Sequence, residues 1–140
     1  MGTRRRAREA ALEMLFQWEM SKGEPAQVKA RYWGAAKSNA GADFANELFA
    51  GTLAALPQID DLLRAHVQHW RLERMAATDR NLLRLAVHEL QAHPETPRPV
   101  IINEALEIAR KYSTSDSVAF INGVLDAIRR TLEASTTNPS

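Results

Sequence analysis

Apolar residues recur along much of the chain at spacings of three and four, which is typical of one face of an α-helix. One such apolar stripe covers residues 59–70. The clearest stripe lies near the C-terminus and consists of Val118, Ile121, Leu125, Ile128 and Leu132. Sustained alternation of apolar and polar residues, the mark of a strand, is missing. The pattern therefore predicts an all-α protein of about seven helices.

Glycine, proline and cap-forming residues divide this pattern into elements. Gly23 with Pro25 ends the first helix, Pro57 starts the fourth, and Thr78 or Asp79 can cap the fifth. The predicted helices cover residues 3–20, 25–39, 43–56, 57–70, 79–90, 100–112 and 118–133. Because the connections are short, we expect one domain over residues 1–134. Residues 135–140 are expected to form a flexible tail.

The composition is that of an ordinary soluble domain. The chain has 140 residues, of which 45% are hydrophobic and 25% charged, and its formal net charge is +1. Any nucleic-acid site must therefore be a local patch. The absence of cysteine excludes disulfides and thiolate metal sites. No run approaches the roughly 18 apolar residues of a membrane span, so we expect a cytoplasmic protein without membrane contact.

The most uneven feature is the basic start of the first predicted helix. Four of the 18 basic residues are Arg4, Arg5, Arg6 and Arg8. A helix N-terminus already carries partial positive charge, so each cation there costs roughly 0.3–1 kcal/mol. Guanidinium groups beside free backbone N–H groups favour an anion, most plausibly phosphate. Nucleic-acid binding and a merely solvated basic end stay equally open from this segment alone.

Two aromatic residues are placed where each could serve binding or packing. Phe16 shares a helix face with Arg5 and Arg8, which suits stacking of a base below phosphate-binding groups. The sequence favours the other interpretation, in which Phe16 widens the core face formed by Ala7, Ala11, Met14 and Trp18. Phe120 lies about 120° off the C-terminal apolar stripe, together with Asp116 and Gly123. Either another chain or another helix of the same bundle is expected to cover it.

No segment carries a recognisable catalytic motif. The segment HELQAH at residues 88–93 resembles the zinc-protease HExxH but has one residue too many. On a continuous helix an offset of five residues separates two side chains by about 140°. The spacing therefore predicts that His88 and His93 do not share a metal ion. Gly-rich phosphate loops and a GxSxG elbow are also absent, so we expect no enzyme, cofactor or metal.

Three blocks of the sequence resemble the NusB family of bacterial transcription antitermination factors. They are RRRAREAALEMLFQWE at residues 4–19, LLRLAVHEL at residues 82–90 and PVIINEALEIARKYSTSDSVAFINGVLDAIRR at residues 99–130. The combination of INEALEIARKY and FINGVL is the most specific part. The blocks span nearly the whole chain, although residues 24–44 match no pattern.

The resemblance implies a fold, partners and a function. It implies two helical bundles packed in one domain, without catalysis or a cofactor. Such proteins bind the boxA sequence of nascent RNA together with NusE, a ribosomal protein. The assembly joins RNA polymerase and other Nus factors and suppresses termination, notably in ribosomal RNA operons.

The resemblance also implies individual roles. Arg4, Arg5, Arg6 and Arg8 correspond to the arginine-rich start that holds RNA phosphates. Phe16 stands where tyrosine is frequent, so stacking is kept while a phenolic hydrogen bond is lost. The other residues that match the RNA-facing surface are Asp79, Asp116 and Phe120. The NusE surface is expected on the helices of residues 66–90, and His88 replaces a common tyrosine.

Two other functions compete with an RNA-binding adaptor. The same helical domain forms the N-terminal part of some ribosomal RNA cytosine methyltransferases. The chain has neither a Gly-rich cofactor segment nor a cysteine nucleophile, which excludes a stand-alone methyltransferase. A detached substrate-binding module of such an enzyme stays open. The second competitor is a protein–protein adaptor that contacts no RNA. A homodimer is also possible, and it could bury the face of Phe120.

Overall fold

The computed structural model describes residues 3–34 and 41–137. Within these ranges the chain forms eight helices and no strand. The helices are α1 (Thr3–Ser21), α2 (Pro25–Trp33), α3 (Ala42–Ala54), α4 (Leu56–His66), α5 (His69–Arg74), α6 (Ala77–Ala92), α7 (Arg98–Tyr112) and α8 (Ser115–Thr137). The prediction of an all-α fold with about seven helices is confirmed.

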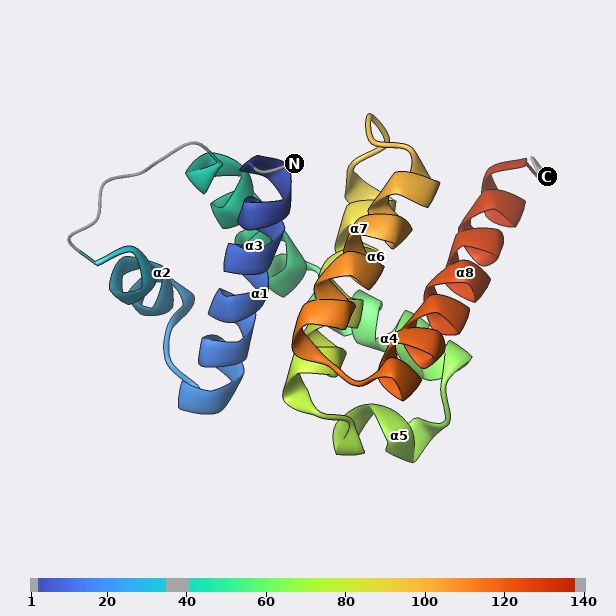
Figure 1. The fold of residues 1–140 in the computed structure, drawn as a ribbon, viewed down its shortest axis with the longest axis horizontal. Helices are drawn as coiled ribbons and strands as arrows, with labels where there is room; N and C mark the ends of the chain where they lie inside the picture. Colours follow the sequence, from blue (N-terminus) through green and yellow to red (C-terminus); the bar gives the residue numbers. More distant parts are fainter. Residues whose placement is uncertain (1–2, 35–40, 138–140) are drawn as a thin grey trace.

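The helices form two groups that share one core. Helices α1, α2 and α3 lie on one side, and α4 to α8 pack together on the other (Figure 1). Helix α6 joins the groups because it contacts α1 and α3 as well as α4, α7 and α8. Residues 81–90 of α6 are buried without exception, which is expected of a helix surrounded on all sides. The two packed bundles implied by the resemblance are thus present.

The predicted fourth helix is two helices, because α4 ends at His66. The backbone of Val67 is extended, with φ −129° and ψ 164°, and Trp70 belongs to α5. The last turn of α4 is closed by the His66 side chain, whose Nδ1 lies 3.0 Å from the carbonyl oxygen of Leu62. Apolar periodicity continued through this break, so it could not reveal the change of direction.

Other helix ends also differ from the prediction. Helix α2 ends at Trp33, because Gly34 adopts φ 56° and bonds the Ala30 carbonyl, and residues 35–39 of the predicted helix lie outside the described ranges. The N-cap position of α6 is Ala76, which forms no side-chain cap, and the predicted cap residues Thr78 and Asp79 lie in the first turn of the helix.

Helix α8 is longer than predicted at both ends. It begins at Ser115 and continues to Thr137, through the start of the expected tail. No glycine or proline occurs between residues 124 and 138, so nothing in the sequence stops the helix before Pro139. Residues 138–140 of the expected tail lie outside the described ranges. None of the described helices is long and apolar enough to cross a membrane.

Candidate nucleic-acid interface

Helix α1 is anchored in the core through its small and apolar residues. Ala7, Ala11 and Met14 are buried, and Trp18 packs against the core from its edge. This agrees with the face predicted from the spacing. The arginines at its start are therefore held on a packed helix and have fixed positions relative to α3, α6 and α7.

Three of the four N-terminal arginines reach solvent, each in a different way. Arg4 is exposed and its guanidinium lies 3.8 Å from the centre of the Phe44 ring. Arg6 is exposed and forms no ion pair with any residue that the structure describes. Arg5 is half-buried and donates two hydrogen bonds to Glu104, at 2.7 and 3.0 Å. This hydrogen bond holds the pKa of the Glu104 carboxyl below its usual value.

Arg8 does not join the others at the surface. Its side chain is buried, with 5% of the residue exposed, and it donates from Nε to Glu89 at 2.9 Å and from Nη2 at 2.5 Å. Glu89 is itself only 1% exposed. The structure does not support the expectation that Arg8 offers its charge to RNA phosphate. Arg8 and Glu89 form a buried, bidentate ion pair between α1 and α6, so the guanidinium already has an anionic partner.

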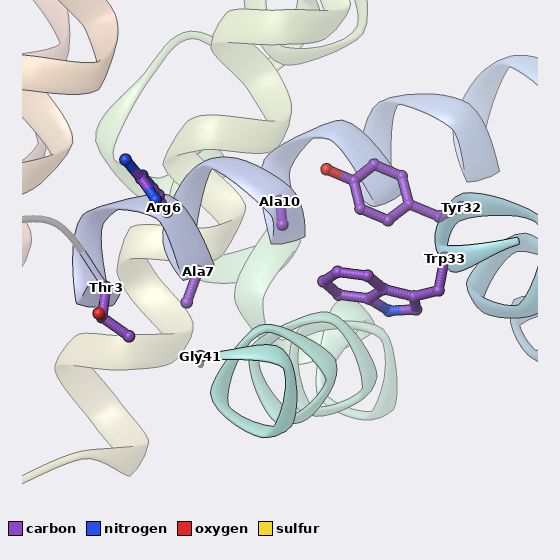
Figure 2. Close-up of a pocket in the computed structure, with 7 residues that line it drawn as sticks. All are labelled: Thr3, Arg6, Ala7, Ala10, Tyr32, Trp33 and Gly41. Atoms are coloured by element: carbon purple, nitrogen blue, oxygen red, sulfur yellow. The ribbon is translucent and has the colours of Figure 1, made fainter. Parts of the chain in front are cut away.

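A pocket beside Arg6 separates α1 from the end of α2. Figure 2 shows Ala7 and Ala10 of α1 lining it opposite the rings of Tyr32 and Trp33. Tyr32 donates to Glu13 at 2.6 Å and Trp33 donates to Asn46 at 2.8 Å, so both polar groups are engaged in holding α2 in place. The two aromatic side chains that line the pocket are therefore fixed by hydrogen bonds to α1 and α3.

Phe16 lies at the surface rather than in the core. It is 40% exposed and lines a cleft with Thr78 and Tyr112, where α1 meets α6 and α7. The Tyr112 hydroxyl donates to Glu13 at 2.9 Å, and burial together with this hydrogen bond raises the pKa of Tyr112 to about 12. Of the two interpretations of Phe16, the structure favours an exposed ring beside a second aromatic ring.

Asp79, Asp116 and Phe120 come together where α5, α6 and α8 meet. They line one cleft with Arg71 and Ser117. Asp79 is buried and accepts hydrogen bonds from Ser113 and Ser117, the latter at 2.9 Å. Its carboxylate therefore fixes the turn between α7 and α8, whereas Asp116 is exposed.

The ring of Phe120 is half-buried and packs against the core. The guanidinium of Arg71 lies 3.9 Å from its centre, so α5 covers one side of it. The expectation that another helix of the bundle covers this ring is thus met in part. The remaining exposed part of the ring faces the cleft with Asp116.

These features lie along one surface. Helix α7 runs beside α1 in the same direction, joined by the side-chain pairs Arg5–Glu104, Glu9–Lys111 and Glu13–Tyr112. The cleft of Phe16 and the cleft of Phe120 are linked through the turn after α7, because Tyr112 of the first cleft is followed by Ser113, whose hydroxyl donates to Asp79 of the second. We call this surface the α1–α7 face and define it by Arg4, Arg5, Arg6, Phe16, Tyr112, Asp116 and Phe120.

Sequence reasoning missed one residue of this surface, Tyr112, and one residue beside it, Arg71. Arg71 sits in the short helix α5, whose existence the apolar stripe concealed. Tyr112 ends α7 within the IARKY part of the most specific block, so its position was visible but its exposure of 37% was not. Their proximity to Phe120 and Phe16 depends on contacts between distant helices.

His88 and His93 lie together, against the expectation from their spacing. His93 is the C-cap residue directly after α6 and has a non-helical backbone, with φ −124° and ψ 69°, so the helical offset of about 140° does not apply to it. The two rings are 5.6 Å apart, and both approach Glu47 of α3.

Comparison with known proteins places the chain in a family. The NusB family model matches residues 5–130. The chain belongs to the NusB family. The transcription antitermination protein NusB of Koribacter versatilis is 49% identical over 135 residues, covering 95% of this chain and 92% of that protein. The relatives carry a non-catalytic function, and this chain is likewise a transcription antitermination factor and not an enzyme, as predicted.

Solved structures have the same fold. The structure of T. maritima NusB superposes with a TM-score of 0.83 at 36% identity and covers 91% of this chain and 90% of its own. A crystal structure of the antitermination factors NusB and NusE in complex with dsRNA gives a TM-score of 0.84 at 24% identity, covering 94% and 98%. The second likeness concerns the fold alone.

Proposed function

We propose that the α1–α7 face binds boxA-containing single-stranded RNA, and that the chain does so together with NusE on the nascent transcript in the cytoplasm. The observation that carries the proposal is the combination on one surface of the exposed Arg4 and Arg6 at one end and exposed aromatic rings at the other. RNA polymerase and other Nus factors would be reached indirectly, through this complex.

Each part of the face suits a different part of an RNA strand. Arg4 and Arg6 present guanidinium groups that can hold phosphates, and Arg5 can do so if it leaves Glu104. Phe16 and Tyr112 offer rings on which unpaired bases can stack. The exposed carboxylate of Asp116 can accept a hydrogen bond from a base amino group.

For NusE, we propose a site within the expected range of residues 66–90. Residues 81–90 are buried in this chain, so a partner could reach only the earlier part of the range, around α5. A protein of the same fold has been solved in complex with NusE and dsRNA, which supports the proposal that NusE is a partner of this chain. We therefore propose that NusE binds near α5, beside the Phe120 end of the α1–α7 face.

A titration of labelled RNA tests the proposal. A boxA-like RNA and a scrambled RNA of the same composition are titrated with the protein, with and without NusE. We expect preference for boxA-like RNA and tighter binding with NusE. Equal binding of both RNAs would contradict sequence recognition, and NusE binding without any RNA binding would favour the protein–protein adaptor.

A further inference from the structure

A cluster of two histidines and a carboxylate lies between α3 and the C-terminal end of α6. Glu47 projects from α3 and His88 projects from α6. His93 is the residue directly after α6. Among the described residues, these three offer one ligand atom each within 4.8 Å of one another. None of them belongs to the α1–α7 face.

The three side chains converge through the nitrogens that commonly bind metals. Glu47 Oε2 lies 3.2 Å from Nε2 of His88, and Glu47 Oε1 lies 2.8 Å from Nε2 of His93. His88 is buried and its ring meets that of His93 edge to face. A small movement of the exposed Glu47 carboxylate would open a space at which all three ligand atoms point.

Gly51 leaves the room that this convergence requires. It lies one helical turn after Glu47 on α3. A Cβ atom at this position would come within 2.5 Å of His88 Nε2 and 3.0 Å of Glu47 Oε2. The lack of a side chain at Gly51 thus allows His88 to reach the carboxylate.

The outer partners of His93 also suit a ligand. Its second ring nitrogen, Nδ1, lies 2.8 Å from Glu95 Oε2, so a carboxylate orients the ring and leaves Nε2 directed at Glu47. Histidine ligands usually have such a carboxylate or carbonyl partner on their other nitrogen. The ring of Phe44 packs edge-on against His93 and limits its rotation.

We propose that Glu47, His88 and His93 bind one divalent transition-metal ion, with Zn²⁺ as the ion that best fits the donors. Two imidazoles and one carboxylate match a known three-ligand zinc set that leaves a fourth position for water. Soft thiolate ligands are lacking, and two imidazole donors argue against Ca²⁺ or Mg²⁺. The ion would join α3 to the end of α6, a structural use that does not rest on RNA binding.

Zinc titration of the tag-free protein after treatment with a chelator tests this site. Isothermal calorimetry with ZnCl₂ should give one ion per chain, and Co²⁺ should produce the visible absorption of a nitrogen- and oxygen-bound ion. His93→Gln and Glu47→Gln should remove this binding. Glu95→Gln should weaken it by about 10–100-fold, because it removes only the outer partner.

His66→Gln is the matched control, because this histidine is bonded to Leu62 and Thr131 far from the cluster. Its binding should equal that of the unchanged chain. Circular dichroism checks that each variant keeps its helices, and His93→Gln is the decisive variant because His93 is less buried than His88. Absence of Zn²⁺ binding, or equal binding by His93→Gln, would show that the cluster is a hydrogen-bonded contact only. Neither result depends on whether the protein binds RNA.

Discussion

Arg8 illustrates how a single charged side chain can serve the fold although its neighbours serve the surface. It pairs with Glu89 in the interior, at a sequence distance of 81 residues. A buried ion pair is costly to form, but removal of one member leaves the other charge buried without a partner. The pair therefore matters chiefly through what happens when it is broken.

We predict that Arg8→Met lowers the free energy of unfolding by about 3–5 kcal/mol. The double variant Arg8→Met/Glu89→Met should regain much of this loss, since a pair of apolar residues leaves no uncompensated charge. Urea denaturation of the three proteins measures the effect. A mild loss in Arg8→Met alone would show that the pair is accessible to water, and would return Arg8 to the list of phosphate-binding candidates.

Phe120 is a second residue whose role the structure divides between packing and binding. We predict that Phe120→Ala weakens RNA binding by about 1–3 kcal/mol, the usual contribution of a ring that stacks a base. Phe49→Ala, at a fully buried ring, is the comparison: it should cost about 3–5 kcal/mol of stability. Thermal unfolding and RNA titration of both variants separate the roles, and a Phe120→Ala protein that binds normally but unfolds like Phe49→Ala would place Phe120 in the core.

At the residue scale, the sequence predicted which residues of a helix face the core better than it predicted their contacts with other helices. The helical wheel placed Ala7, Ala11 and Met14 toward the core correctly, because apolar spacing reports burial. It also grouped Arg8 with Phe16, yet the structure buries the first and exposes the second. The difference comes from Glu89 on α6, and no periodicity within α1 contains information about a residue on another helix.

At the scale of elements, the end of α1 is joined to α6 by a network around Glu19. Its carboxylate accepts hydrogen bonds from Arg80, Asn81 and Arg84, and Arg84 also pairs with Asp60 of α4. Burial alone would raise the pKa of Glu19, but the two arginines and the asparagine outweigh it, so its pKa is lowered.

The lowered pKa of Glu19 predicts a loss of stability in acid. This contribution is complete above the usual value of 4.5 and is lost as the pH falls through the lower pKa of the folded state. Chemical unfolding between about pH 6 and about pH 3 should therefore show a smaller decline for Glu19→Gln than for the unchanged chain. Glu107→Gln, at a half-buried position of α7 that pairs with Arg110 outside the Glu19 network, is the control and should decline as the unchanged chain does. Equal declines in all three proteins would remove Glu19 from this account.

The start of α1 yields a prediction about salt. For single strands, log affinity falls with log salt by roughly 0.7 for each phosphate neutralised. We predict that Arg4→Ala/Arg6→Ala reduces this slope by about 1.4. The charge-matched control, Lys29→Ala/Arg130→Ala, removes two exposed cations outside the α1–α7 face and should keep the slope. An unchanged slope in the first variant would exclude these arginines from phosphate binding.

Helix boundaries were predictable where helix-breaking residues and the ends of apolar stripes coincide, and not elsewhere. Helix α7 was placed closely because prolines precede it and cap-forming residues follow. The gap between α4 and α5 carries neither glycine nor proline, so the stripe ran through it. The relation of His88 to His93 was misjudged for a related reason: the helical wheel assumes a continuous helix, whereas α6 ends at Ala92, before His93.

At the scale of the whole molecule, the proposed interface is mixed in charge. The net charge is only +1, and the same surface that carries the arginines carries Glu9, Glu13 and Glu104 in ion pairs or hydrogen bonds. Affinity should then depend on a few free cations and on stacking, with NusE supplying further contacts. That residues 1–134 form one domain, and that the chain can form a homodimer, stay predictions.

Whole-molecule features followed from the resemblance more than from the pattern. The wheel predicted helices, but the grouping into two bundles came from the family-like blocks. The clefts of the α1–α7 face depend on contacts between α1, α6, α7 and α8 that no single segment encodes. A composite surface therefore required the structure, although several of its residues were named in advance.

Mapping the residues that contact bound RNA tests most directly the central claim that the α1–α7 face binds RNA. Backbone amide chemical shifts of the isotope-labelled protein are recorded during titration with boxA-like RNA. We predict that the largest changes occur at Arg6, Phe16, Tyr112 and Asp116, while Lys29 and Arg130 stay unchanged. Changes confined to α2 or to the C-terminal half of α8, with the α1–α7 face unaffected at saturation, would contradict the account.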